Sequence, residues 1–155
     1  MQIVNTQHQS HQLSIKSILL IDDNDIDNYI SSHLIQKTGF TGEVILKSSA
    51  EEGLNYLQSG IEGNVPLPEI IFLDIRMPAM DGFEFLQEFA KLNPIAENNC
   101  SIYMLSSSID KRDIEQAKKN PNVADFITKP LNIDKLNTVL SAWENQQTEL
   151  FKQSA

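Results

Sequence analysis

The chain has 155 residues, a length typical of one domain. With 41% hydrophobic and 21% charged residues it can build one core, which excludes wholesale disorder and a fibrous design. The 12 Lys and Arg residues against 21 Asp and Glu give a formal net charge of -9, so binding to nucleic acid or to an anionic membrane is not expected. No stretch approaches the roughly 20 apolar residues that span a bilayer, and the expected location is the cytoplasm.

Composition also divides the chain. Residues 1–15 are rich in Gln, Ser, Asn and His and lack apolar periodicity, which predicts a flexible tail in which His8 and His11 are merely solvated. One domain is expected over residues 16–147, followed by a short polar tail over 148–155. The single cysteine, Cys100, cannot form an intrachain disulfide and is interpreted as a part-buried small hydrophobe.

The first half of the domain alternates between apolar runs and segments of helical period. The run at 18–21 is continuous, as in a strand covered on both faces of a parallel sheet. Residues 26, 29, 30, 33 and 34 then fall at helical spacing, and Gly39 supplies a stop. A second strand is predicted at 44–46. The second helix is predicted at about 49–60, where Ser49 and Glu52 resemble a capping box.

The second half repeats this alternation. A third continuous run, 70–73, ends at Asp74, and the helix after it should end before Pro94. The remaining predicted elements are a strand at 102–105, a helix at about 110–120, a strand at 126–128 and a helix over about 133–147. Such alternation implies right-handed crossovers and helices on both faces of a parallel sheet. The predicted fold class is α/β, a flavodoxin-like doubly wound five-stranded sheet of order 2-1-3-4-5.

Polar side chains follow four of the five predicted strands, at the edge where this architecture binds ligands. They are Asp22, Asp23, Asp74, Ser106 and Lys129. Each alone is an ordinary strand-end residue, but three converging carboxylates would repel one another unless a cation joins them, and oxygen-only ligands suit Mg²⁺. With positive charge and a hydroxyl nearby to neutralise phosphoryl oxygens, Asp74 could attack a phosphorus atom. The pattern therefore predicts phosphoryl transfer.

Four segments carry a family resemblance: IDD at 21–23, FLDIRMPAMDG at 72–82, MLSS at 104–107 and ITKPL at 127–131. Together they resemble the receiver domain of two-component response regulators.

The resemblance implies a role for each matching residue. Asp74 would be the phosphoacceptor, and Lys129 would pair with the phosphoryl group. Asp23 would bind Mg²⁺ directly, Asp22 would act largely through metal-bound water, and the backbone carbonyl of Arg76 would complete the protein ligands.

The same resemblance implies a switch. Ser106 replaces the commoner Thr, and Phe126 stands where receivers carry an aromatic ring that turns inward when the hydroxyl residue moves. Pro130 fits a cis Lys-Pro bond. Arg76 and Ser108 border the path of water to the acyl phosphate, so we expect them to set the rate of autodephosphorylation.

The expected function is that of a stand-alone phosphoacceptor switch rather than an enzyme, with only self-catalysed phosphotransfer and autodephosphorylation. A histidine kinase or histidine phosphotransfer protein would supply the phosphoryl group. The surface over about residues 110–147 would then act on a downstream protein that the sequence does not identify.

Three alternatives belong to other classes. An aspartate-nucleophile phosphatase needs a second Asp two residues after the nucleophile, where this chain has Arg76. A flavin or nucleotide binder needs a phosphate-cradling loop after the first strand, where this chain has an anionic segment at 22–25. A receiver-like docking module that works without phosphorylation would not need the complete set of site residues.

Overall fold

The computed structural model describes residues 15–107 and 110–153, which form a five-stranded parallel sheet of order β2-β1-β3-β4-β5. The elements in chain order are β1 (Ser17–Ile21), α1 (Asp25–Lys37), β2 (Glu43–Lys47), α2 (Ala50–Ile61), β3 (Ile70–Asp74), α3 (Gly82–Ala90), α4 (Pro94–Asn99), β4 (Ser101–Ser106), α5 (Lys111–Lys119), β5 (Val123–Thr128) and α6 (Ile133–Gln153). The predicted fold class, the strand order and all five strands are confirmed.

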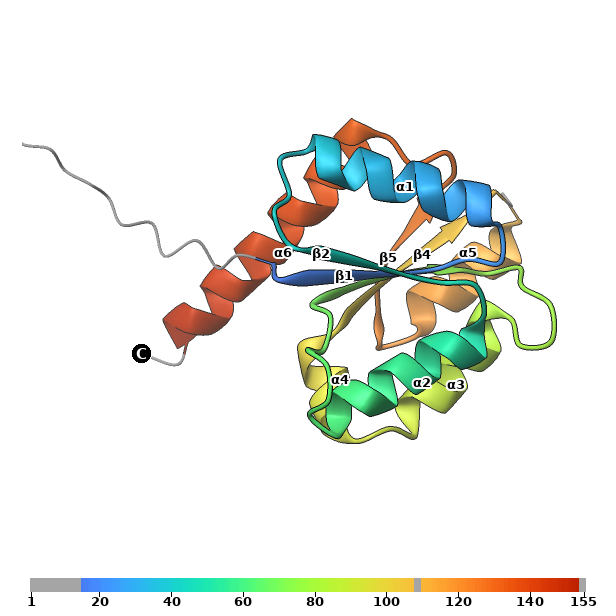
Figure 1. Cartoon of the computed structure of the whole chain (residues 1–155), viewed down its shortest axis with the longest axis horizontal. Coiled ribbons are helices and arrows are strands. Elements are labelled where there is room, and N and C mark those ends of the chain that lie inside the picture. Colours follow the sequence, from blue (N-terminus) through green and yellow to red (C-terminus); the bar gives the residue numbers. More distant parts are fainter. Residues whose placement is uncertain (1–14, 108–109, 154–155) are drawn as a thin grey trace, which may run out of the picture.

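Helices cover both faces of the sheet, with α1 and α6 on one side and α2, α3 and α4 on the other (Figure 1). Alternate residues of the central strands supply the two cores. Leu19 and Leu73 pack with side chains of α2 and α3, whereas Ile18 and Phe72 pack with side chains of α1 and α6. This double burial explains why the strand sequences are continuously apolar.

Two helices differ from the sequence-based expectation. Pro94 was expected only to stop a helix, but it also begins the short helix α4, where the Asn93 side chain accepts a hydrogen bond from the Ile95 backbone N–H. Proline suits the first turn of a helix because its missing N–H is not needed there. The final helix continues through the predicted polar tail to Gln153.

The outward face of α1 also differs from the prediction. Ile26 and Tyr29 fall at helical spacing, yet each is about 70% exposed (69% and 70%), and the buried residues of this helix are Asn28 and Ile35. The apolar period therefore located the helix correctly but not the side that packs on the sheet.

The start of the domain lies slightly earlier than predicted. Ile15 was assigned to the N-terminal tail, but it is buried in the core beneath α1 and α6. Residues 1–14, including His8 and His11, lie outside the described residues.

Cys100 is buried, as expected, and its burial raises the pKa of the thiol to about 12.

The helix α2 begins as predicted but without the complete capping box. The Ser49 hydroxyl accepts a hydrogen bond from the Glu52 N–H, whereas the Glu52 carboxylate accepts one from the Ser48 N–H rather than from Ser49.

Among the helices that the structure describes, none combines the length and apolarity needed to cross a membrane.

Candidate functional site

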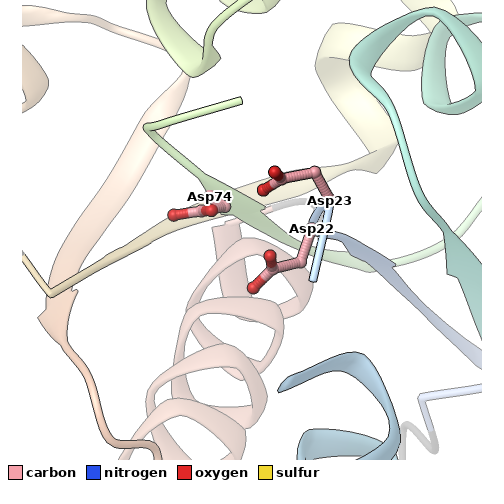
Figure 2. A group of neighbouring side chains, drawn as sticks. All are labelled: Asp22, Asp23 and Asp74. Carbon is pink, nitrogen blue, oxygen red and sulfur yellow. The ribbon is translucent and has the colours of Figure 1, made fainter. Parts of the chain in front are cut away.

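Three carboxylates converge at the carboxyl edge of the sheet, as the sequence predicts. Asp22 and Asp23 follow β1, Asp74 ends β3, and each offers an oxygen atom within 4.8 Å of the others (Figure 2). Asp22 and Asp74 are buried, while Asp23 is exposed. These oxygen donors fit a hard divalent cation such as Mg²⁺, which prefers carboxylate and water ligands.

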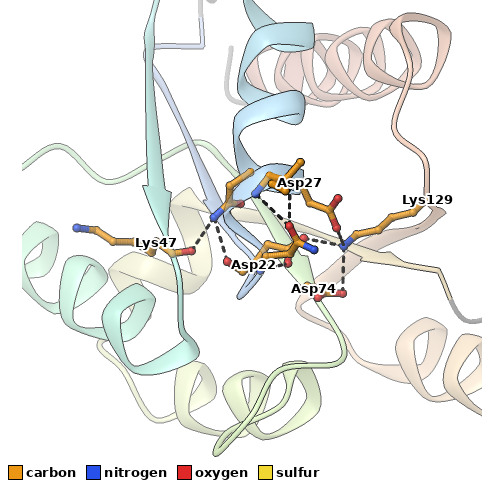
Figure 3. Close-up of polar contacts among 8 residues, drawn as sticks. Asp22, Asp27, Lys47, Asp74 and Lys129 are labelled. Atoms are coloured by element: carbon orange, nitrogen blue, oxygen red, sulfur yellow. Dashed lines mark hydrogen bonds and ion pairs between the residues drawn. The ribbon is translucent and has the colours of Figure 1, made fainter.

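Lys129 brings positive charge to this cluster from the end of β5. Its Nζ atom lies 2.6 Å from Asp22 Oδ2, 3.2 Å from Asp27 Oδ2 and 3.6 Å from Asp74 Oδ1 (Figure 3). The lysine side chain is only 18% exposed, so solvent screens these contacts less than it screens surface ion pairs. The predicted meeting of Lys129 with the acidic residues is confirmed.

The pKa values reflect this crowding. Burial and the negative charge of Asp22 raise the pKa of Asp74 to about 6, although the ammonium of Lys129 opposes the shift. Burial alone would lower the pKa of Lys129, but the neighbouring carboxylates, led by Asp22, outweigh burial and raise it. Without a further cation, negative charge therefore exceeds what Lys129 can neutralise.

The acidic pair after β1 is held by the start of α1. The Asp22 carboxylate accepts a hydrogen bond from the Asn24 N–H, and the Asn24 side chain caps α1 by accepting hydrogen bonds from the Ile26 and Asp27 N–H groups. The buried Asn28 amide donates to the backbone oxygens of Asp22 and Lys47. The sequence analysis missed Asn28 because a polar residue gives no signal that it faces the core.

The loop after Asp74 is fixed at its far end by α3. The Gly82 N–H donates to the Ile75 oxygen at 2.8 Å, and a Cβ atom at Gly82 would lie only 2.6 Å from the backbone oxygen of Asp74. Asp81 and Glu84 form a reciprocal capping box at the start of α3. Glycine is thus required where the loop turns back against the end of β3.

The ends of β4 and β5 place the remaining predicted residues. Ser106 is buried at the end of β4, and its backbone oxygen accepts a hydrogen bond from the Lys129 N–H at 2.9 Å. The Lys129–Pro130 peptide bond is cis, as predicted. Phe126 lies on β5, half-buried against the core beneath α2 and α3. Ser108 lies outside the described residues, so its role stays a prediction.

Arg76 reaches from the loop after β3 to α5. Its Nη2 atom lies 2.7 Å from Oδ2 of Asp113, which is buried, while the arginine side chain is 64% exposed. This ion pair joins the loop beside Asp74 to the first turn of α5. Asp113 did not emerge from the sequence because it lies in a helix rather than at the end of a strand.

The raised pKa of Asp74 predicts a pH-dependent stability. In the folded chain Asp74 binds its proton up to a higher pH than in the unfolded chain, so its stabilising contribution is lost as pH rises from about 4 to about 6. In EDTA at pH 7 we expect Asp74→Asn to raise the free energy of unfolding by about 1–3 kcal/mol. At pH 4 the gain should largely disappear. Urea denaturation of both chains measures this difference.

The matched control is Asp25→Asn, which removes an exposed carboxylate from the first turn of α1. An equal gain in the free energy of unfolding in Asp25→Asn would contradict the expected charge crowding. So would a gain in Asp74→Asn that is the same at pH 4 and pH 7.

Comparison with curated proteins gives relatives of modest identity. A probable methanogenesis regulatory protein, FilR2 of Methanothrix harundinacea, is 28% identical over 77% of this chain and 75% of its own length. The response regulator Rcp1 of Synechocystis is 28% identical over 84% of this chain and 87% of its own length. The chain spans only 14% of the sensor histidine kinase CheAY of Helicobacter pylori, to which it is 30% identical.

Solved structures and a family model each match most of the chain. A two-component response regulator from Cytophaga hutchinsonii matches with a TM-score of 0.79 and 32% identity, over 85% of this chain and 98% of that one. A response regulator receiver protein from Dyadobacter fermentans matches with a TM-score of 0.73 and 31% identity, over 83% and 97%. The family model described as the response regulator receiver domain matches residues 18–141. With the sheet order and the strand-end residues in place, the chain belongs to the receiver domains of two-component response regulators.

Proposed function

We propose that this receiver domain accepts a phosphoryl group on Asp74 in the presence of Mg²⁺ and signals through the surface formed by α5, β5 and α6. A histidine kinase or a histidine phosphotransfer protein is the proposed donor. The observation that carries the proposal is the position of Asp74, which has the acidic pair after β1 within 4.8 Å and Lys129 at 3.6 Å.

The reaction follows from these side chains. A carboxylate oxygen of Asp74 attacks the phosphorus of a phosphohistidine, the P–N bond breaks, and the imidazole nitrogen keeps the electron pair. The ammonium of Lys129 and the hydroxyl of Ser106 neutralise and orient the phosphoryl oxygens. Asp22, Asp23, Asp74 and the backbone carbonyl of Arg76 would hold Mg²⁺, which when bound supplies further positive charge to the phosphoryl oxygens. The domain in this proposal is a switch with self-catalysed chemistry rather than an enzyme that turns over a substrate.

The proposed acceptor is tested by the intact mass of the chain after incubation with Mg²⁺ and acetyl phosphate. We expect one phosphoryl adduct, on Asp74. This carboxylate ends β3, with Asp22 and Asp23 on one side and Lys129 at 3.6 Å. The adduct should be absent without Mg²⁺ and absent in Asp74→Asn. Labelling that persists in Asp74→Asn would place the acceptor elsewhere, and no labelling of the wild type would leave a phosphorylation-independent docking module.

The proposed output surface contains a groove beside Phe126. The groove has a volume of about 300 Å³ and is lined by Asp125, Phe126, Ile127, Thr128, Lys135, Thr138 and Val139. Its floor is β5 and its wall is α6, and the strand leads directly to Lys129. Movement of the Phe126 ring would therefore change the shape of a surface that adjoins the phosphorylation site.

Phe126→Ala tests this coupling. Beryllofluoride with Mg²⁺ mimics the phosphoryl group, and in the wild type we expect it to shift the amide resonances of groove residues Thr138 and Val139. In Phe126→Ala the shifts at the groove should be lost, while those of the loop after Asp74 remain. Phe83→Ala, at another half-buried ring on the same core, is the matched control. A groove response that survives in Phe126→Ala would dismiss the switch role.

Arg76→Ala tests the lifetime of the acyl phosphate. The Arg76 side chain is held beside the site by Asp113 at 2.7 Å, and we propose that it obstructs the approach of water. We expect the phosphoryl half-life to shorten by about two- to tenfold, which corresponds to a barrier lower by at most about 1.4 kcal/mol. Asp113→Asn should act in the same direction because it releases the arginine. An unchanged half-life in Arg76→Ala rejects this role.

A further inference from the structure

Lys129 contacts a carboxylate that the receiver motifs do not include. Asp27, in the first turn of α1, places its Oδ2 atom 3.2 Å from the lysine Nζ atom, closer than Asp74 at 3.6 Å. Asp27 does not belong to the group of carboxylates that converge as a metal site. Its contact with Lys129 therefore needs a separate account.

We propose that Asp27 is a positioning residue that restrains phosphorylation, because it holds the ammonium of Lys129 away from Asp74. The inference rests on the proposed function, since it concerns how readily Lys129 binds the phosphoryl group on Asp74. Before phosphorylation the ammonium donates hydrogen bonds to Asp22 and Asp27 and makes a longer ion pair with Asp74. When a phosphoryl group arrives on Asp74, Lys129 must exchange the contact with Asp27 for one with a phosphoryl oxygen.

The geometry favours competition over simple support of Lys129. Asp22 lies only 2.6 Å from Nζ and is 9% exposed, so it already fixes the ammonium without help. In Figure 3 the ammonium lies between Asp27 on one side and Asp74 on the other, with Asp22 beside them. A pull toward Asp27 is therefore a pull away from the phosphoacceptor.

Asp27 is held in a position where it can compete with Asp74 for the ammonium of Lys129. Its backbone N–H donates to the Asn24 side chain at 3.1 Å, and the next residue, Asn28, ties α1 to the backbone of Asp22 and Lys47. The anchored helix therefore keeps the carboxylate near Lys129. A second effect also restrains phosphorylation, because the negative charge of Asp27 repels an arriving phosphoryl group.

The pair can also separate. Asp27 and Lys129 both line a cavity of about 350 Å³ between α1 and the ends of β4 and β5, and the Asp27 side chain is 42% exposed. Water can therefore solvate the carboxylate once the ammonium leaves it. Such a partly exposed contact is a modest restraint rather than a block.

The test compares Asp27→Asn with Asp25→Asn. Both changes remove one carboxylate from the first turn of α1, but Asp25 is exposed, and the ion pairs of Lys129 in the described structure are with Asp22, Asp27 and Asp74. Isothermal titration with beryllofluoride at saturating Mg²⁺ measures affinity for a phosphoryl mimic, and intact mass measures the initial rate of labelling by acetyl phosphate.

We expect Asp27→Asn to bind beryllofluoride about two- to fivefold more tightly than the wild type and to label faster by a similar factor, as the loss of a partly exposed ion pair allows. Asp25→Asn and the charge-retaining Asp27→Glu should both stay near the wild type. Unfolding curves of each variant check that the fold is unchanged.

Several outcomes would overturn the inference. Unchanged or weaker beryllofluoride binding in Asp27→Asn would show that Asp27 supports Lys129 or is indifferent to it. An equal gain in Asp25→Asn would show a general charge effect. In both cases the wild type still binds and labels, so the proposed function stands. A wild-type chain that neither binds beryllofluoride nor labels would overturn the proposed function and this inference together.

Discussion

The repulsion among three carboxylates at one edge of the sheet is the constraint on which the site depends. Asp22, Asp23 and Asp74 lie close together, two of them buried, and one ammonium group cannot neutralise all of them. Burial, together with the negative charge of Asp22, raises the pKa of Asp74 to about 6 even though the ammonium of Lys129 opposes the shift. Unmatched negative charge at this edge favours a divalent cation, and under the proposed function the same cation would favour the phosphoryl group.

The parallel sheet makes this crowding possible. Ile21 pairs with Leu73 and Asp74 pairs with Leu105, so the ends of β1, β3 and β4 lie side by side. Two continuous apolar cores hold the strands at that register, and removing a carboxylate would not free the sheet to relax. The burial that stabilises the fold therefore also holds the like charges together.

The fold and the five strand-end residues could be predicted from the sequence because both follow from local patterns. Continuous apolar runs identify strands, and the residue that ends each run lies at the ligand-binding edge. Asp27 and Asp113 could not be predicted, because both lie in helices rather than at strand ends, so no strand-end pattern marks them as neighbours of Lys129 and Arg76. The buried face of α1 was misjudged because Ile26 and Tyr29 of its apolar period are exposed, whereas Ile35 and the polar Asn28 are buried against the sheet.

The contact between Asp22 and Lys129 joins residues separated by 107 positions, nearly the full span of the domain. Closing a loop of this length without the intervening strands is entropically costly, so the contact is favoured only once those strands have paired. A chain in which β5 has not yet joined β4 would carry the acidic cluster without its ammonium group. The site is therefore complete only when β5 has joined the sheet, so under the proposed function a partly folded chain would accept a phosphoryl group poorly.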